Sequence, residues 1–315
     1  MKRLFRVTLS LLLLAGASDL GARNDTSASV GPATILPEGP GSGEDFRFVA
    51  LGDTGTGGEA QRAIANRMLA FQEQHPYNEV LLLGDNAYPH GEPSDLAAKF
   101  EQPFAELLRR GVRFNAVLGN HDVEHGRTAQ LNYPPFHMGG RAYYSFAKGS
   151  GLVEFFALDS NNMEPEQLRW LEKALAASKA KWKIAFLHHP LYSTAKRHGS
   201  DVALRALLEP LFIRYEVAAV FCGHDHVYER TKLQQGVQYF VTGAGAKLRR
   251  GDIDRRSTLL ATGNDETNSF MYLQVTPGQL AFWAVDADGH ILDGGTLADG
   301  ATNRSGSVST GETRP

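Results

Sequence analysis

The chain reads FRFVALGDTG from Phe46 to Gly55, an apolar run that ends in a glycine and an aspartate. Four further apolar runs along the chain also end in polar residues. Runs of Val, Leu, Phe and Ala of this length are typical of strands covered on both faces. A glycine near the strand end lets the chain turn sharply. The five motifs are Gly52-Asp53-Thr54-Gly55, Gly84-Asp85-Asn86-Ala87-Tyr88, Gly119-Asn120-His121-Asp122, His188-His189-Pro190 and Gly223-His224-Asp225-His226.

The order of apolar runs and amphipathic stretches predicts the fold class. Strands are expected at 46–51, 80–83, 114–118, 152–158, 182–187, 218–221, 270–275, 279–284 and around 290–292. Helices are expected around 64–71, 100–107, 164–178 and 202–215, the last broken or kinked at Pro210. Alternating strands and helices followed by a β-rich end indicate an α/β fold. We expect a four-layer α/β/β/α sandwich with two mixed sheets.

The two ends of the chain differ in composition from its centre. A basic start and the apolar core 7–14 precede Ala15-Gly16-Ala17, which predicts a signal peptide over 1–17 and a secreted or periplasmic protein. The apolar core is too short to span a bilayer, so no membrane association is expected after cleavage; an uncleaved anchor is the alternative. Residues 18–44 read as a flexible linker and 298–315 as a disordered tail. The catalytic domain is therefore expected at 45–297.

The overall composition is that of an ordinary soluble globular protein, with 42% hydrophobic and 21% charged residues. The net charge of −3 gives no reason to expect nucleic acid as a stable partner. The single cysteine, Cys222, excludes an intrachain disulfide and reads as a small buried hydrophobe. Nothing in the sequence indicates the oligomeric state. A basic cluster is either a solvated loop or a rim that attracts anionic substrates: Lys247, Arg249, Arg250, Arg255 and Arg256.

The polar residues of the five motifs are metal ligands by type. Strand ends of an α/β sheet open into one crevice, where these side chains would meet. His224 and His226 lie two residues apart in a tight loop, so they can turn to different metals. Seven protein donors for two ions leave positions open for water and substrate, as catalysis requires. The expected donors are Asp53, Asp85, Tyr88, Asn120, His188, His224 and His226.

The motif series Gly-Asp-x-Gly, Gly-Asp-x-x-Tyr, Gly-Asn-His-Asp, His-x-Pro and Gly-His-x-His resembles that of the purple acid phosphatases, within the calcineurin-like metallophosphoesterase superfamily. The likeness extends over roughly 46–246 and includes Trp170–Lys173 and Val241–Gly245. The chain has no room for the extra N-terminal β-domain of the large plant-type members, so it resembles the short form. Its Tyr228-Glu229-Arg230 sequence is nevertheless a trait of the large form.

The resemblance implies a ligand set. Asp53, Tyr88 and His226 would hold Fe(III); Asn120, His188 and His224 would hold divalent Fe, Zn or Mn; Asp85 would bridge the two. The superfamily's first motif is usually Asp-x-His, but Gly55 stands in place of that histidine. Tyr88 could replace it with a phenolate, which favours Fe(III). The choice of His188 over His189 follows from alignment and strand phase.

The activity implied by the resemblance is hydrolysis of small-molecule phosphate monoesters at acidic pH, by direct attack of a metal-bound hydroxide. His121 and His198 resemble the family's second-sphere histidines and are the candidate catalytic groups, although one extra residue precedes His198. The sequence does not say which of them is the general acid. Asp122 is expected to orient an imidazole.

Two other functions fit the sequence less well. One is an Mn- or Zn-dependent metallophosphoesterase that acts on phosphodiesters or nucleotides, and Tyr88 and Gly55 argue against it. The other is a catalytically silent metal- or phosphate-binding protein. Such proteins usually lose ligands, whereas all seven positions are filled here.

Overall fold

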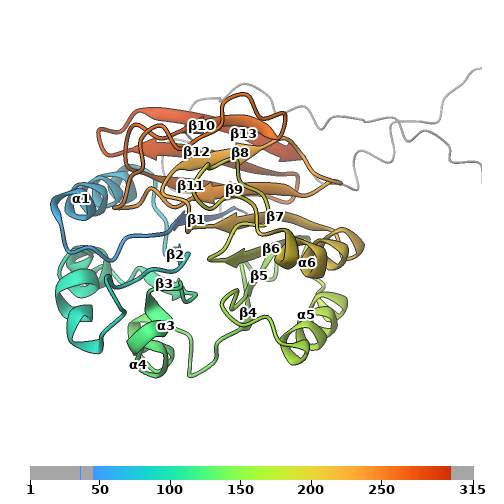
Figure 1. Ribbon diagram of the computed structural model, residues 1–315, viewed down its shortest axis with the longest axis horizontal. Helices are drawn as coiled ribbons and strands as arrows, with labels where there is room; N and C mark the ends of the chain where they lie inside the picture. The colour runs from blue at the N-terminus through green and yellow to red at the C-terminus, as the bar shows by residue number, and fades with distance from the viewer. Residues whose placement is uncertain (1–35, 37–44, 299–315) are drawn as a thin grey trace, which may run out of the picture.

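The protein is described by a computed structural model that covers residues 36 and 45–298. Two β-sheets lie face to face with helices on the outside (Figure 1). The first sheet has the strand order β13-β12-β11-β1-β2-β3. Its members β1, β2 and β3 are parallel, and β11, β12 and β13 are antiparallel. They span Phe46–Leu51 (β1), Glu79–Leu82 (β2), Arg113–Ala116 (β3), Ser269–Val275 (β11), Gln279–Asp286 (β12) and Ile291–Ala298 (β13).

The second sheet has the strand order β10-β8-β9-β7-β6-β5-β4. Its members β5, β6, β7 and β9 are parallel, while β4, β8 and β10 run antiparallel to their neighbours. The expected α/β class with two mixed sheets is therefore confirmed. These strands span Tyr144–Lys148 (β4), Val153–Ala157 (β5), Trp182–Leu187 (β6), Val217–Cys222 (β7), Tyr228–Thr231 (β8), Gln238–Thr242 (β9) and Leu260–Asn264 (β10).

Aromatic and aliphatic side chains fill the space between the layers. The Phe48 ring lies between the sheets, 5.0 Å from the Phe155 ring centroid and fully buried. Phe156 points the opposite way, into the apolar cluster beneath α5 (Pro165–Ala177) and α6 (Val202–Arg214). On the outer face of the first sheet, α1 (Glu59–Gln74) packs Phe71 against β11. The order of layers is thus helix, sheet, sheet, helix.

Two of the predicted helices differ from the structure. Helix α6 continues past Pro210, where a break or a kink was expected, so the helix is not broken there. A proline removes one backbone hydrogen bond, but Leu204, Leu208 and Phe212 remain buried on the second sheet and hold the helix. The stretch predicted as one helix at 100–107 is divided between two short elements. The shorter helices are η1 (Pro93–Asp95), η2 (Ala97–Glu101), α2 (Ala105–Arg109), α3 (Asp122–His125), α4 (Arg127–Leu131) and η3 (Pro134–Phe136).

The predictions for the chain ends fall outside the described residues. These are the signal peptide at 1–17, the linker at 18–44 apart from Leu36, and the tail at 298–315 apart from Ala298. Among the helices of residues 45–298, none has the length and apolar character needed to cross a membrane.

Candidate metal centre

The five motifs follow the ends of β1, β2, β3, β6 and β7, and backbone hydrogen bonds join two pairs of them. The Asp53 amide donates to the Gly84 carbonyl at 3.0 Å. The Gly223 amide donates to the His188 carbonyl at 3.0 Å. A Cβ at Gly52 would lie 3.1 Å from the Gly223 Cα, so glycines let the two sheets meet closely here. The expected convergence of the motifs is present.

Three of the expected ligands have an uncommon backbone conformation. Asp53, Asp85 and His224 have φ values of 59°, 54° and 71°, in the left-handed region. Residues other than glycine rarely adopt it, and it persists where the surroundings hold it, which is common at functional sites. Here the Asp53 carboxylate accepts from the His224 amide at 2.9 Å and helps to fix both loops.

The first donor group comprises Asp53, Tyr88 and His226. The Tyr88 hydroxyl donates to Asp53 Oδ1 at 3.0 Å and lies 3.4 Å from His226 Nε2. His226 Nε2 lies 3.4 Å from the same Asp53 oxygen. Ligand atoms of Asp53, His226 and Asp85 all lie within 4.8 Å of one another. The three residues that the resemblance places on Fe(III) therefore surround one point beside Asp85.

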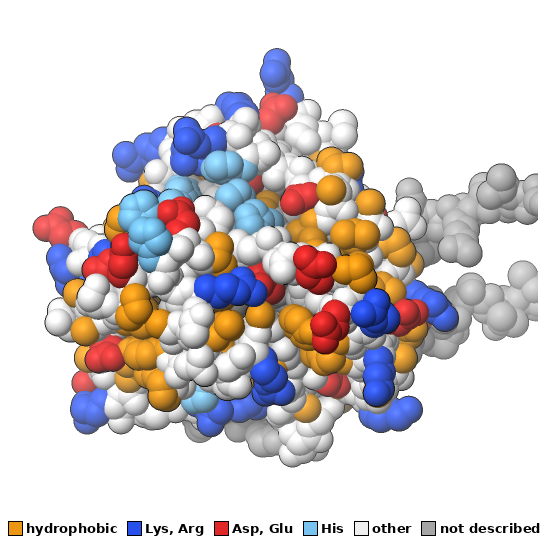
Figure 2. Space-filling model, turned by 60° about the horizontal axis from the view of Figure 1, so that its bottom comes forward, with side chains coloured by type: hydrophobic (Ala, Val, Ile, Leu, Met, Phe, Trp, Pro, Cys, Tyr) orange, Lys and Arg blue, Asp and Glu red, His pale blue; other side chains and the backbone are white. Residues whose placement is uncertain are grey.

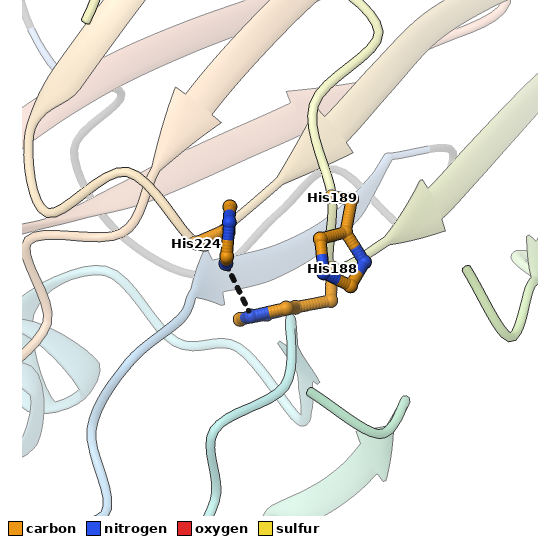
Figure 3. A group of neighbouring side chains, drawn as sticks. All are labelled: His188, His189 and His224. Atoms are coloured by element: carbon orange, nitrogen blue, oxygen red, sulfur yellow. Dashed lines mark hydrogen bonds between the residues drawn. The ribbon is translucent and has the colours of Figure 1, made fainter. Parts of the chain in front are cut away.

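The second donor group comprises Asn120, His188 and His224, and Figure 3 shows His188 directed toward His224. His188 Nδ1 lies 2.8 Å from the Leu83 carbonyl. Because a carbonyl only accepts, Nδ1 carries the proton and Nε2 presents its lone pair to the site. That Nε2 lies 3.1 Å from Asn120 Oδ1, 3.2 Å from His224 Nδ1 and 3.5 Å from Asp85 Oδ1.

The donor chemistry fits two cations. His188 Nε2, Asn120 Oδ1 and Asp85 Oδ1 are all acceptors, and their lone pairs repel one another at these distances unless a cation lies among them. Asp85 reaches both donor groups, which is the position of a bridging carboxylate. A mixture of imidazole, carboxylate, amide and phenol donors suits Fe, Zn or Mn.

Burial sets the protonation states of these donors. Burial, reinforced by His188 and His189, lowers the pKa of His224 to about 2. Burial and the charges of Arg249 and Lys247 lower that of His226 to about 4. Both imidazoles are therefore neutral and able to bind a metal. Burial, then Asp53 and Asp85, raise the pKa of Tyr88 far above its usual value, so the phenol keeps its proton until a cation displaces it.

Gly55 has no space for a side chain. A Cβ there would lie 2.2 Å from the carbonyl carbon of Asn86. The Gly55 amide donates to the Asp85 carbonyl at 3.1 Å, and the Tyr88 amide donates to the Gly55 carbonyl at 2.8 Å. The loop that carries Tyr88 thus packs directly on Gly55. The same contact excludes a histidine at position 55 and brings the phenol to Asp53.

The two candidate catalytic histidines lie beside different donors, His121 near Asp85 and His198 near His224. His121 Nδ1 lies 2.6 Å from the Pro89 carbonyl, so Nδ1 donates and Nε2 faces the centre, 4.0 Å from Asp85 Oδ2. The ring of His198 lies 4.3 Å from the ring of His224, between centroids. His198 lines a pocket of about 380 Å³ together with His189 and His224.

The expected role of Asp122 is wrong. This buried carboxylate accepts from the backbone amides of Asn86 at 2.9 Å, Ala87 at 3.1 Å and Gly119 at 2.8 Å, not from an imidazole. It therefore ties the loop after β2 to the loop after β3. The prediction rested on the rule that ligating histidines often donate to a carboxylate, whereas two of these backbone partners, Asn86 and Ala87, lie 36 and 35 residues away in the sequence.

The basic cluster divides into two parts. Lys247 Nζ lies 4.1 Å from the centroid of the Tyr88 ring, and the Arg249 amide donates to the His226 carbonyl at 3.0 Å. Histidines and basic side chains gather on one face of the molecule (Figure 2). Lys247 and Arg249 thus lie beside the donors, and attraction of anionic substrates by them stays a prediction. The pairs with acidic residues outside the donor groups are Arg249 with Asp252, Arg250 with Glu266, Arg255 with Asp265 and Arg256 with Asp254.

The family profile of the calcineurin-like phosphoesterases matches residues 46–228, the segment that contains all five motifs. The chain belongs to this family. Tartrate-resistant acid phosphatase type 5 of Oryctolagus cuniculus is 27% identical to this phosphoesterase, over 82% of the chain and 92% of the relative. Purple acid phosphatase 17 of Arabidopsis thaliana is 30% identical, over 66% of the chain and 70% of the relative. The resemblance to purple acid phosphatases is therefore confirmed.

Solved structures show the same fold. Purple acid phosphatase PPD1 from Lupinus luteus seeds superposes on this phosphoesterase with a TM-score of 0.71 at 21% identity, over 88% of this chain and 58% of the other. GAP50, described as the anchor in the inner membrane complex of Plasmodium, also reaches 0.71 at 20% identity, over 81% and 89%. At these identities the structures show the fold alone.

Proposed function

We propose that this calcineurin-like phosphoesterase is a secreted or periplasmic acid phosphatase that hydrolyses small phosphate monoesters. The observation that carries the proposal is the contact of Tyr88 with Asp53 and His226, beside a Gly55 that leaves no room for a histidine. Relatives named acid phosphatase align with most of the chain and support it. The basic and apolar pattern of residues 1–17 supports export.

In this proposal Asp53, Tyr88 and His226 would hold Fe(III), and Asp85, which reaches both donor groups, would be available to either ion. When bound, the two ions lower the pKa of water and neutralise charge on the phosphate. A buried phenol that releases its proton only to a cation favours the more highly charged metal at this position. The residues proposed for divalent Fe, Zn or Mn are Asn120, His188 and His224.

The chain's own side chains bind the substrate and move the proton. The hydrogen bond of His121 Nδ1 to Pro89 leaves Nε2 to exchange a proton with the leaving group. His198 lines the pocket beside His224 and is the other histidine proposed to contact the ester. Lys247 and Arg249 contribute positive charge beside the donors, which raises the local concentration of an anionic ester.

The first experiment is a visible spectrum of the mature protein with metal analysis and assays on p-nitrophenyl phosphate at acidic and neutral pH. We expect bound iron, a broad visible band and hydrolysis that is faster on the acid side. A colourless protein that holds Zn or Mn and prefers phosphodiesters would favour the alternative metallophosphoesterase. Metal binding without hydrolysis of any ester would favour the catalytically silent protein.

Tyr88→Phe is expected to remove the visible band and to leave measurable hydrolysis. The substitution deletes the phenolate oxygen but keeps Asp53, His226 and Asp85 beside the metal. Absorption and turnover on p-nitrophenyl phosphate are compared at equal iron content. Tyr143→Phe is the matched control, because Tyr143 contacts Trp170 away from the donors. An unchanged band in Tyr88→Phe would show that Tyr88 is not a ligand.

A further inference from the structure

The motif Tyr228-Glu229-Arg230 on β8 has no part in the metal centre described so far. Tyr228 and Arg230 lie two residues apart, so their side chains share one face of the strand. Both bond to Asp293 of β13: the Tyr228 hydroxyl donates to Oδ2 at 2.7 Å, and Arg230 donates to both oxygens, at 2.7 and 3.1 Å. Because β13 belongs to the other sheet, these bonds fix β8 to the opposite layer.

Glu229 points to the other face and is fully buried. Its carboxylate accepts from the Thr194 amide at 3.0 and 3.1 Å and from the Thr194 hydroxyl, and its Oε2 lies 2.9 Å from Ser193 Oγ. Within residues 45–298, no lysine or arginine forms an ion pair with it. A buried carboxylate without a cation is costly, even when it is well hydrogen-bonded. This cost suggests that the carboxylate does more than stabilise the fold.

The segment that Glu229 holds leads directly to His198. Thr194 and Arg197 are also tied to the chain around residue 252: the Thr194 carbonyl accepts from the Asp254 amide at 2.9 Å, and the Arg197 amide donates to Asp252 Oδ1 at 3.1 Å. His198 follows immediately and lies beside His224. The loop is thus fixed on both sides just before the candidate catalytic histidine.

Ser193 links Glu229 to the last ligand motif. Its hydroxyl lies 2.7 Å from Asp225 Oδ2, and Asp225 stands between His224 and His226. Glu229 therefore contacts, through Ser193 and Thr194, both the loop of His198 and the loop of two donors. A displacement of Glu229 would change the position of His198 relative to His224.

We propose that Glu229 is a positioning residue that holds His198 beside His224, and that Tyr228, Arg230 and Asp293 anchor the strand that carries it. The inference rests on the proposed function, since His198 acts on a substrate only if the centre hydrolyses phosphate esters. Glutamine cannot replace the carboxylate fully, because the Thr194 amide donates to both carboxylate oxygens and the glutamine NH₂ group would itself be a donor there.

The test is Glu229→Gln, assayed on p-nitrophenyl phosphate with the metals bound. We expect kcat to fall by about 10-fold while KM changes by less than about 2-fold and metal content stays unchanged. The amide of Thr194 should exchange hydrogen for deuterium faster. In a His198→Ala background, Glu229→Gln should cause no further loss, because both changes act through the same side chain.

Glu209→Gln is the matched control. Glu209 accepts from the Tyr192 hydroxyl at 2.6 Å, so the same chemical change is made beside the same loop but away from His198. It should leave kcat and the exchange of Thr194 unchanged. If Glu229→Gln does not fold, Thr194→Val removes one of the same hydrogen bonds and is tested in the same two backgrounds.

Equal loss of kcat with and without His198 would overturn the proposal, as would a loss explained by missing metal. An unchanged kcat in Glu229→Gln would also overturn it. A wild-type protein that does not hydrolyse p-nitrophenyl phosphate would instead contradict the proposed function. In that case the exchange rate of the Thr194 amide would still decide whether Glu229 holds the loop.

Discussion

Replacing Asp85 by asparagine is expected to remove metal binding and to lower kcat/KM by about 10³-fold or more. Asp85 lies 3.5 Å from His188 Nε2 in one donor group and within 4.8 Å of the ligand atoms of Asp53 and His226 in the other. A carboxylate there can bind two cations with its two oxygens and neutralises part of their charge. An amide has one oxygen donor and no charge, so both ions would be held more weakly.

The measurement is metal content together with hydrolysis of p-nitrophenyl phosphate. Asp95→Asn is the control, because Asp95, on the 3₁₀ helix η1, pairs with Lys99 at 2.6 Å and undergoes the same chemical change. The control should retain both metals and full turnover. Turnover at the wild-type rate by Asp85→Asn would exclude a centre in which this carboxylate bridges two ions.

The predicted strands were those with continuous apolar sequence. β1 and β6 begin and end at the predicted residues, because their side chains are buried on both faces and leave an unbroken apolar run. β8 was not predicted, since it reads Tyr-Glu-Arg-Thr. Its polar side chains can be buried because they form hydrogen bonds with Asp293 and Thr194, which lie far away in the sequence. Such partners are not visible in a local pattern.

Within the candidate site, too, local motifs were predictable and long-range contacts were not. Each metal donor was proposed from a motif of a few residues, and the structure brings all seven together; their assignment to particular ions stays a prediction. The role predicted for Asp122 was wrong, and no role was predicted for Glu229. In both cases the hydrogen-bond partners lie far away in the sequence. Asp122 bonds to an amide 36 residues earlier, and Glu229 bonds to one 35 residues earlier. Contacts of this kind depend on how the loops pack, which short motifs do not encode.

Gly119→Ala is expected to disrupt the centre, although it replaces none of the proposed donors. A Cβ at this position would lie 2.1 Å from Asp85 Oδ1 and 2.3 Å from the Asp85 backbone nitrogen. The nitrogen belongs to the backbone after β2, so the loop must shift and Asp85 moves with it. We expect a loss of about 1–3 kcal/mol in the free energy of unfolding from overpacking. Hydrolysis should fall by at least about 100-fold, because misplaced groups lose most of their catalytic effect.

Gly278→Ala is the control that distinguishes the effect of this close contact from a general effect of replacing glycine. Gly278 lies in the turn between β11 and β12, and a Cβ there would meet nothing within 4 Å. Thermal unfolding, metal content and turnover should therefore match the wild type. If Gly119→Ala also kept its metals and turnover, Asp85 could adopt its position without the close approach of the loop after β3. The bridging geometry would then depend on the metals themselves rather than on the packing of the two loops.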